Sequence, residues 1–278
     1  LRLLTRPDVT RMAFIGAGNM GYSLLQSLNN QSDVSFDVTI VEPNPSDNLQ
    51  DLCKKKRFTL LSQPTVSSSS FDIVMLAVKP QMIEAGIHAA NNFIGQSTLL
   101  ISILAGKTLS EIEKLLLIPI AVIRAMPNTP ISVGRGVTGL FANTETSLQH
   151  RHLAEVILSS ASTVEWLSKE DDINALTAVS GSGPAYVFYL VECLTQAGVD
   201  AGLPADLAKR IARKTIEGAG ELLFQSPEIT ATKLRQNVTS PGGTTEAALS
   251  ILMGDDGLES LMTTAVNAAR DRARALSK

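Results

Sequence analysis

Cysteine is scarce in this sequence, and its two cysteines stand far apart. Cys53 and Cys193 form no Cys-x-x-Cys pair, and no histidine stands beside either of them. A disulfide framework and a cysteine-based zinc site both need such groupings, so neither is expected. We predict two buried, reduced thiols and no metal site.

The chain also lacks an excess of positive charge and a long apolar run. Lys and Arg number 24 against 27 Asp and Glu, a net charge of −3, which argues against nucleic acid and for a small-molecule partner. The apolar stretch Leu115 to Ile123 is broken by Pro119 and is shorter than the ~20 residues that cross a bilayer. No apolar signal segment follows the first arginines, so we expect a cytoplasmic protein without membrane contact.

Aromatic residues make up only 4% of the chain, whereas hydrophobic residues as a whole make up 44%. Small aliphatic side chains in such number favour close packing of helices on a sheet. The 278 residues exceed the ~100–200 that are usual for one domain, so two domains are expected.

The first half alternates short apolar runs with helical stretches. Strands separated by helices imply parallel βαβ units, and strands that are apolar throughout belong to a sheet covered on both faces. We predict a Rossmann-type, doubly wound, mostly parallel sheet over residues 1–168. Gly136–Phe141 and Thr163–Leu167 are expected to complete it, in directions that stay open, with one antiparallel strand as an option. The main predicted strands are Met12–Ile15, Asp37–Val41, Asp72–Val78, Thr98–Leu104 and Ile120–Arg124.

Beyond Asp172 the strand signals stop and helical periodicity begins. We therefore predict an all-α domain over residues 169–278. Its last helix presents more small apolar surface than a domain of ~110 residues covers alone, so dimerisation through these helices is expected. The predicted helices are Ala185–Ala197, Pro204–Phe224, Thr245–Met253 and Leu258–Ala275.

A glycine-rich turn lies between the first predicted strand and the first predicted helix. After Met12–Ile15 the chain reads Gly-Ala-Gly-Asn-Met-Gly and enters a helical stretch from Tyr22 to Leu28. This context favours a dinucleotide-binding turn over a turn that only packs a helix on a sheet. Amides at the helix start then bind the pyrophosphate. The predicted cofactor-binding residues of this turn are Gly16, Ala17, Gly18, Asn19, Met20 and Gly21.

An acidic residue at the end of the second strand bears on the choice of cofactor. Glu42 follows Asp37–Val41, where a carboxylate binds the adenosine ribose hydroxyls and repels a 2′-phosphate. Asn44 and Ser46 lie just beyond it and can hydrogen-bond a phosphate, but no arginine follows closely. NADH is favoured and NADPH stays open, with Glu42 and Asn44 as predicted cofactor-binding residues.

Three later strand ends also suit a ligand, because ligands bind at the carboxyl ends of strands in an open parallel sheet. Lys79 can approach the ribose or a phosphate, or is simply a solvated lysine at a helix start. Ala105 is small enough to line the nicotinamide face. Two prolines fix the loop Arg124–Pro130 and leave Asn128 with free hydrogen-bonding groups, with a structural turn as the alternative. The predicted cofactor-binding residues here are Ala77, Val78, Lys79, Pro80, Ala105 and Asn128.

Two polar loops in the second half suit an anionic substrate. Ser180–Tyr186 reads SGSGPAY, in which the glycines indicate a close approach to the backbone. Asn237–Glu246 reads NVTSPGGTTE and runs into a helix start, where free amides and hydroxyls form a natural carboxylate receptor.

Five segments of this chain resemble pyrroline-5-carboxylate reductases in their order and spacing: GAGNMG, AVKPQ, MPNTP, SGSGPAY and SPGGTT. The resemblance spans about residues 11 to 275. It implies reduction of L-1-pyrroline-5-carboxylate to L-proline, the last step of proline synthesis, with NADPH or NADH as the cofactor. It also implies a homodimer with interlocked helical domains and, as a larger assembly, a decamer made of five dimers.

The same resemblance implies a substrate site in the second half. Asn237, Thr244 and Thr245 are expected to meet the substrate, with the hydroxyl of Thr245, the predicted catalytic residue, near the ring nitrogen. The family position that matches Thr244 is often alanine, so its hydroxyl is expected to be dispensable. The predicted substrate-binding residues are Ser182, Asn237, Ser240, Gly242, Gly243, Thr244 and Thr245.

The implied reaction asks little of side chains. A protonated cyclic imine is already electrophilic, so its orientation over the nicotinamide supplies much of the rate. His88, His150 and His152 fall in no motif and are expected on helix surfaces. Glu170 and Glu228 are expected to complement helix starts, and a contact of either with the substrate or a partner subunit is left open.

Two other functions fit part of the sequence. A β-hydroxyacid dehydrogenase has this architecture but needs a lysine in the first helix of its second domain, and Ala185–Ala201 contains neither lysine nor histidine. A non-catalytic NAD(P)H-sensing regulator has no need of the substrate-loop motifs. The imine reductase is therefore favoured.

Overall fold

The computed structural model describes residues 9–28, 35–65 and 70–277. The chain forms two compact units. The first comprises the residues up to Gly181 together with those from Arg270 onward, and the second comprises Ser182–Ala269. Arg2 and Arg6, on which the expectation about a signal segment partly rests, lie outside the described residues.

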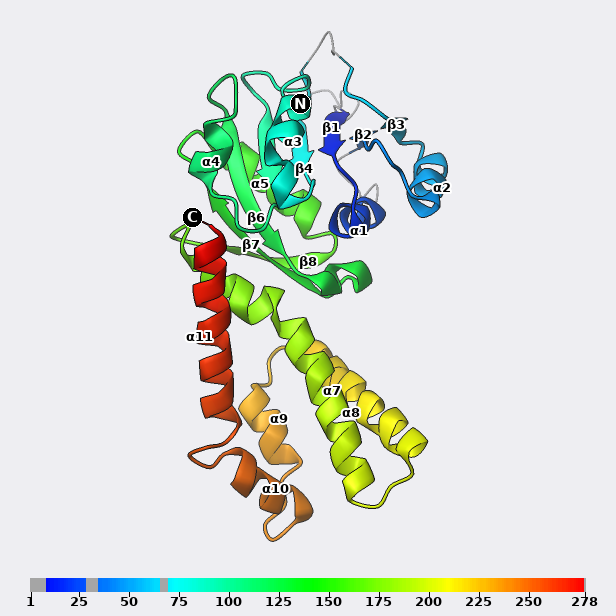
Figure 1. Cartoon of the computed structure of the whole chain (residues 1–278), viewed down its shortest axis with the longest axis vertical. Coiled ribbons are helices and arrows are strands. Elements are labelled where there is room, and N and C mark those ends of the chain that lie inside the picture. Colours follow the sequence, from blue (N-terminus) through cyan, green and yellow to red (C-terminus); the bar gives the residue numbers. More distant parts are fainter. Residues whose placement is uncertain (1–8, 29–34, 66–69, 278) are drawn as a thin grey trace, which may run out of the picture. The chain divides into compact units, whose positions relative to one another are not determined.

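A sheet of eight strands forms the first unit, in the order β3-β2-β1-β4-β5-β6-β7-β8 (Figure 1). Neighbouring strands from β3 to β6 are parallel, β7 runs antiparallel to β6, and β8 is parallel to β7. The strand order reverses between β1 and β4, which makes that point the switch point of a doubly wound sheet. The predicted fold class is thus confirmed. The strands are β1 (Thr10–Ile15), β2 (Phe36–Val41), β3 (Thr59–Leu61), β4 (Ile73–Leu76), β5 (Leu99–Ser102), β6 (Ala121–Pro127), β7 (Gly136–Ala142) and β8 (Ser162–Trp166).

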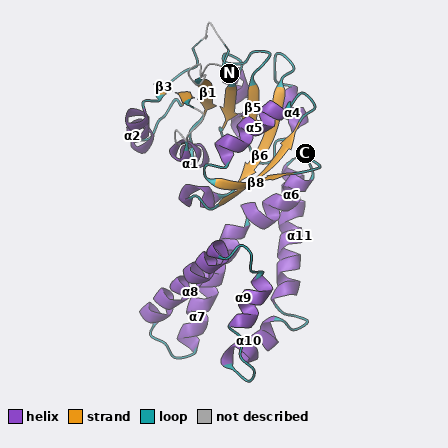
Figure 2. Ribbon diagram, turned by 180° about the vertical axis from the view of Figure 1, so that it is seen from behind, coloured by secondary structure: helices purple, strands orange, loops and turns teal. Residues whose placement is uncertain are grey.

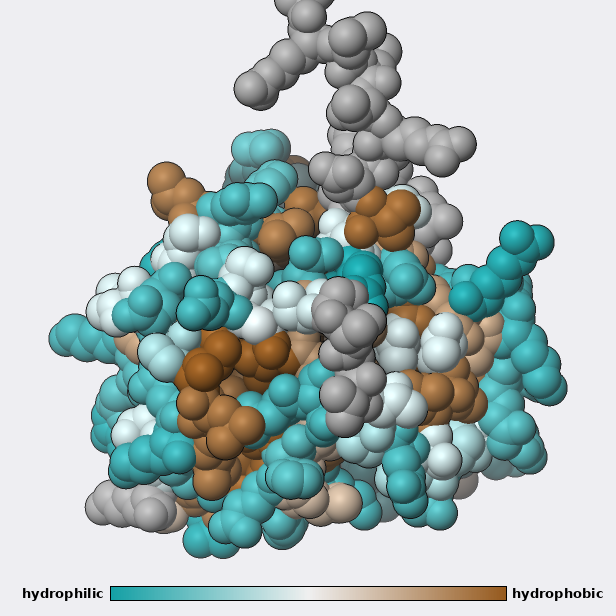
Figure 3. All heavy atoms as spheres, turned by 90° about the horizontal axis from the view of Figure 1, so that it is seen from above, coloured by the Kyte–Doolittle hydropathy of each residue, from teal (hydrophilic) through white to brown (hydrophobic). Residues whose placement is uncertain are grey.

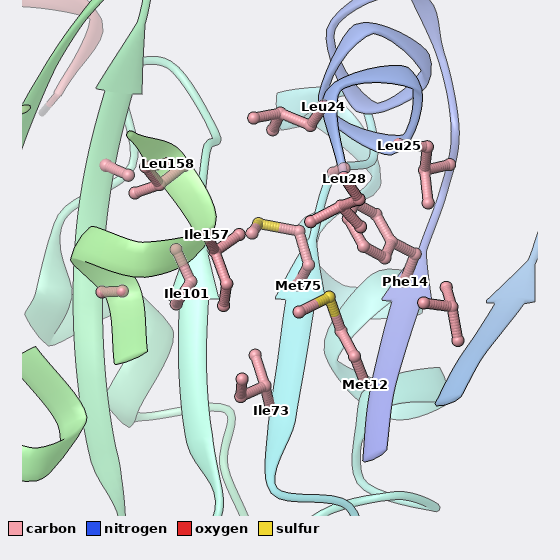
Figure 4. Packing of buried hydrophobic residues seen from close by; sticks show 14 of the residues in the cluster. Met12, Phe14, Leu24, Leu25, Leu28, Ile73, Met75, Ile101, Ile157 and Leu158 are labelled. Carbon is pink, nitrogen blue, oxygen red and sulfur yellow. The ribbon is translucent and has the colours of Figure 1, made fainter. Parts of the chain in front are cut away.

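Helices cover both faces of this sheet (Figure 2). Along β1, Met12 and Phe14 pack in one core with α1, α2 and α5, whereas Ala13 and Ile15 pack in the other with α3 and α4. Figure 4 shows the first core, with side chains of α1 and α5 closing over β1, β4 and β5. The helical elements are α1 (Asn19–Ser27), α2 (Asp47–Lys56), η1 (Pro80–Met82), α3 (Ile83–Ala90), α4 (Leu109–Glu113), η2 (Thr129–Val133), α5 (Leu148–Leu158), α6 (Asp172–Leu176) and η3 (Thr177–Gly181).

The second unit is helical, and the four predicted helices are confirmed within a few residues at each end. One helix, α9, was not predicted as a separate element, and Asn237, which we expected in a polar loop, is its last residue. The helices are α7 (Gly183–Asp200), α8 (Ala205–Gln225), α9 (Ala231–Asn237), α10 (Thr244–Leu252) and α11 (Leu258–Leu276). The last turns of α11, from Arg270 onward, belong to the first unit.

The helical unit buries little apolar surface by itself. Among the described residues from 182 to 269, Ala208 and Ala212 are the only buried hydrophobic residues, whereas large apolar side chains such as Phe188 on α7 and Leu261 on α11 are exposed. The first unit, by contrast, has two hydrophobic cores. The face of the molecule that Figure 3 shows is mostly hydrophilic, with apolar patches. A helical unit of this kind needs a further surface to pack against.

The two thiols differ in their surroundings. Cys53 is buried on α2, and this burial raises the pKa of its thiol. Cys193 is exposed on α7, so the expectation that both thiols are buried is wrong for this residue. The reason is that α7 has an apolar face that this chain alone leaves open.

The boundary between the compact units falls after Gly181, later than the change from strands to helices at residue 168. Leu176 of α6 packs over Gly139 of β7, which has no side chain to block it. Arg274 Nε donates to Asp171 Oδ1 at 3.1 Å, and this bond lowers the pKa of Asp171. These contacts attach α6 and the end of α11 to the sheet. The functional division into residues 1–168 and 169–278 stays a prediction.

Glu170 lies at a junction inside the first unit. Arg124, whose side chain is 4% exposed in the centre of β6, donates from Nη1 to Glu170 Oε1 at 3.0 Å. The Leu109 amide donates to the same oxygen at 2.7 Å. Glu170 therefore neutralises a buried guanidinium and holds the start of α4.

We expect Glu170→Ala to lower the free energy of unfolding by about 3–5 kcal/mol, because Arg124 would stay buried without a counter-charge. Urea unfolding at a fixed protein concentration measures this. The control is Asp51→Ala, which breaks an exposed pair with Lys54 and should cost less than about 1 kcal/mol. Equal losses for the two variants would contradict the account.

Candidate functional site

The turn between β1 and α1 has room for glycine alone at its first position. Gly16 has φ +86°, and a Cβ there would lie 2.9 Å from the Ala77 carbonyl oxygen. A Cβ on Gly21 would come within 3.2 Å of Ala77 Cβ, so α1 approaches the end of β4 closely. By contrast, a Cβ on Gly18 would meet no atom within 4 Å. Gly18 is the N-cap of α1, and no side chain caps that helix. The first backbone amides of α1 can therefore donate hydrogen bonds to a ligand.

Glu42 lies against this turn. The Ala17 amide donates to Glu42 Oε2 at 3.0 Å, and the Asn44 amide donates to Glu42 Oε1 at 3.1 Å. The structure thus places a carboxylate at the end of β2, beside the glycine turn, where an adenosine ribose lies in dinucleotide-binding folds.

The sheet order brings two further predicted segments next to the turn, since β4 and β5 follow β1 directly. Ala77 is buried and its amide donates to the Ile15 carbonyl at 2.9 Å, whereas Lys79 is exposed at the start of η1. Ala105 is exposed in the loop that follows β5. The carboxyl ends of β1, β2, β4 and β5 therefore form one edge that carries most of the predicted cofactor residues.

Asn128 is placed differently from our expectation. It follows β6 and is only 7% exposed. Its Oδ1 accepts from the Val137 amide at 2.8 Å, and its Nδ2 donates to the Ser180 carbonyl at 3.0 Å. The prediction of free hydrogen-bonding groups is wrong for this residue, because the loop turns back onto β7 and α6–η3 packs beside it.

In the second unit, the predicted carboxylate receptor is a turn followed by a helix start. The Gly243 amide donates to the Ser240 carbonyl at 3.0 Å, and α10 begins at Thr244. Gly243 is the N-cap and provides no side-chain cap, so the first amides of α10 suit an anion. Thr245 is half-buried and Thr244 is exposed.

Glu246 is a residue of this turn whose contact the sequence analysis missed. Its Oε2 accepts from the Gly242 amide at 2.7 Å. A glutamate three positions after an N-cap often reaches back to the N-cap amide, and Gly243-Thr244-Thr245-Glu246 has this spacing, although here the bond goes one residue farther back, to Gly242. The Gly242 amide is therefore engaged within the chain, and the amides at the start of α10 are the better receptors.

The remaining titratable candidates lie outside these segments. His88 and His152 are exposed, and His150 accepts from the Ser147 amide at the start of α5. Glu228 is exposed between α8 and α9. Among the described residues, no group of three His, Cys, Asp or Glu is arranged to hold a metal ion.

None of the helices described in the structure is both long and apolar enough to span a bilayer. The cytoplasmic location stays a prediction.

The fold and the glycine turn define a dinucleotide-dependent oxidoreductase with a helical second unit. Residues 11–106 match a family model described as NADP oxidoreductase coenzyme F420-dependent. Residues 170–276 match the model of pyrroline-5-carboxylate reductase dimerisation. The chain belongs to the pyrroline-5-carboxylate reductase family, and its helical unit is an oligomerisation unit of that family.

Individual relatives agree over nearly the whole chain. The pyrroline-5-carboxylate reductase of Pseudomonas aeruginosa is 36% identical over 268 residues, which cover 96% of this chain and 97% of that protein. The corresponding protein of Synechocystis is 35% identical over 269 residues, with 96% and 98% covered.

Solved structures agree as well. The structure of a pyrroline-5-carboxylate reductase from Coxiella burnetii is similar with a TM-score of 0.87 and 36% identity, covering 98% of this chain and all of that one (100%). The Plasmodium falciparum pyrroline carboxylate reductase, solved with NADP bound, has a TM-score of 0.77 and 27% identity, with 98% and 99% covered.

We expect Gly18→Ala to fold normally but to bind the reduced cofactor at least about tenfold more weakly, because its methyl group fills the space through which pyrophosphate approaches. Fluorescence titration with NADH and NADPH measures the Kd, and thermal unfolding checks the fold. Gly218→Ala is the matched control, since Gly218 on α8 also has no atom within 4 Å of an added Cβ. An unchanged Kd for Gly18→Ala would refute the assignment.

Proposed function

We propose that this chain reduces L-1-pyrroline-5-carboxylate to L-proline with NADH or NADPH, the final step of proline biosynthesis. The observation that carries this proposal is the match of both units, over nearly the full length, to proteins named pyrroline-5-carboxylate reductase. The glycine turn and the α10 start agree with it, because one suits a dinucleotide and the other suits the carboxylate of the substrate.

The residues at the sheet edge fit a dinucleotide. The amides of α1 receive the pyrophosphate, and the small side chain of the exposed Ala105 leaves space for the nicotinamide ring. When bound, the reduced nicotinamide supplies a hydride to the imine carbon, and the ring nitrogen keeps its proton to become the amine of proline. We assign cofactor binding to Gly16, Ala17, Gly18, Asn19, Met20, Gly21, Glu42, Asn44, Ala77, Val78, Lys79, Pro80 and Ala105.

The turn before α10 is assigned to the substrate. Its amides receive the carboxylate. The Thr245 hydroxyl accepts from the N–H of the protonated imine, which orients the C=N bond, and donates to the ring nitrogen once that nitrogen becomes an amine. We assign substrate binding to Ser182, Asn237, Ser240, Gly242, Gly243, Thr244 and Thr245, with Thr245 as the catalytic residue.

We further propose that the oligomer is a homodimer formed through the helical unit. The exposed apolar side chains of α7, α8, α10 and α11 support it, since this unit has almost no core of its own. A decamer of five dimers is the larger assembly that the resemblance to the family implies.

Glu42 leads us to propose a preference for NADH, because its charge beside the ribose position repels a 2′-phosphate. The kcat/KM with NADH should exceed that with NADPH. Glu42→Gln should raise kcat/KM with NADPH about tenfold, roughly 1.4 kcal/mol, by removing one like charge. Asp51→Asn, which removes an exposed carboxylate from α2, should leave the ratio unchanged. A wild type that strongly prefers NADPH would refute this role of Glu42.

We expect Thr245→Ala to lower kcat/KM for the imine about tenfold or more, since a hydrogen bond to the reacting ring is lost. Cofactor binding should not change, because Thr245 lies in the substrate turn. Steady-state kinetics with varied pyrroline-5-carboxylate measures the effect. Thr264→Ala, which removes an exposed α11 hydroxyl bonded to the Ser260 carbonyl, is the control. Normal kinetics for Thr245→Ala would reject even a positioning role.

A further inference from the structure

The chain passes from the first unit into α7 through an irregular joint. Here α6 continues as η3, a π-helical turn that ends at Gly181, and α7 begins at Gly183. In a regular α-helix the amide of residue 184 would donate to the Ser180 carbonyl. That residue is Pro184, which has no N–H. Short π-helical segments of this kind often occur at functional sites.

Asn128 replaces the missing helical donor. Its Nδ2 donates to the Ser180 carbonyl at 3.0 Å. The orientation of the amide is determined by the Val137 N–H, which needs an acceptor and finds Asn128 Oδ1 at 2.8 Å. Because Asn128 is 7% exposed, water does not readily take over either bond if the side chain is lost.

The side-chain amide of Asn128 connects the loop that follows β6 to the segment around Ser180, and these two segments have different predicted roles. The loop that starts at Asn128 continues as η2, which packs against α1, the helix of the dinucleotide turn. Ser180 lies two residues before Ser182, which we assigned to the substrate. One side chain thus relates the cofactor side of the first unit to the chain segment that enters α7.

We infer that Asn128 is a positioning residue for hydride transfer, acting through the Ser180 carbonyl rather than by contact with the cofactor. This inference rests on the proposed reductase function. A displacement of about 1 Å in a residue that orients the substrate costs up to roughly a hundredfold in rate. Loss of Asn128 therefore lowers kcat and leaves cofactor affinity almost unchanged.

The first test is the pH profile of Asn128→Asp. A carboxylate at this position still accepts from Val137, but its second oxygen faces the Ser180 carbonyl and cannot donate. We expect kcat at pH 8 to fall about 10- to 100-fold, with the Kd of the reduced cofactor near its wild-type value. Burial raises the pKa of such a carboxyl, so as pH falls toward about 6 the protonated form donates to Ser180. The kcat of Asn128→Asp relative to wild type should then recover. If the pH profiles of kcat for the variant and the wild type stay parallel, the inference is overturned.

The second test supplies the missing donor from the helix itself. Pro184→Ala introduces an N–H four residues after Ser180. In a double-mutant cycle, Asn128→Ala should cost about tenfold or more in kcat in the wild-type background and clearly less in the Pro184→Ala background. The same cost in both backgrounds would overturn the inference, and this comparison holds even if Pro184→Ala itself changes the rate.

Asn143 offers a matched control, because its side-chain amide bonds to the start of β6, whereas Asn128 follows the end of that strand. Its Oδ1 accepts from the Val122 amide at 3.0 Å, and its Nδ2 donates to the Ile120 carbonyl at 2.9 Å. Asn143→Ala removes an equivalent bridge and should lower the unfolding temperature without a change in kcat. If Asn143→Ala reduces kcat as strongly as Asn128→Ala, the effect is structural and the positioning role is wrong.

The activity of the wild type distinguishes a failure of the proposed function from a failure of the role of Asn128. A wild type that oxidises neither NADH nor NADPH with pyrroline-5-carboxylate would refute the proposed function and, with it, this inference. An active wild type whose Asn128 variants keep their kcat would refute the inference alone.

Discussion

Where β1 turns into α1, the backbone lies so close to the end of β4 that no side chain fits between them. A Cβ on Gly16 would lie 2.9 Å from the Ala77 carbonyl oxygen and from the Val78 side chain, and a Cβ on Gly21 would lie 3.2 Å from Ala77 Cβ. This contact lies at the switch point of the sheet, where the strand order runs outward in both directions. No side chain caps the start of α1, and an added Cβ on Gly18 would meet no atom within 4 Å, so the first amides of this helix have room for a phosphate. The predicted cofactor edge is built around this arrangement.

The second unit differs from the first in how it is stabilised. Its helices have apolar faces but bury almost no apolar residue among themselves, so its stability depends on packing against another surface. The match to a dimerisation family model explains why these apolar faces are exposed in a single chain. In the same unit, α10 begins without a side-chain cap, and this helix start is the substrate receptor that we propose.

Much of the first unit was predictable because a doubly wound sheet leaves a strong pattern. Runs such as Ile73–Leu76 are apolar at every position, since both faces are covered, and the glycine turn stands between a strand and a helix. Thr59–Leu61 was missed because this strand is short, lies at the edge and is only partly buried. The antiparallel direction of β7 depends on the loop after β6, whose path no periodicity encodes.

The contacts of individual polar side chains were the least predictable part of the site. Asn128 was expected to be free and is engaged at both ends, because its partners lie 9 and 52 positions away in the chain. Glu42 lies where the sequence placed it, because its position depends only on the end of β2 and the glycine turn; its role in cofactor binding stays a prediction. Family resemblance added the reaction, which neither composition nor spacing specifies.

The most direct test of the account is the stoichiometry of one reaction. Purified protein is given reduced nicotinamide cofactor and L-1-pyrroline-5-carboxylate, and the loss of cofactor absorbance is compared with the L-proline formed. We expect one L-proline for each cofactor oxidised and no oxidation without the imine. Cofactor that binds but stays reduced when the imine is present would contradict this expectation.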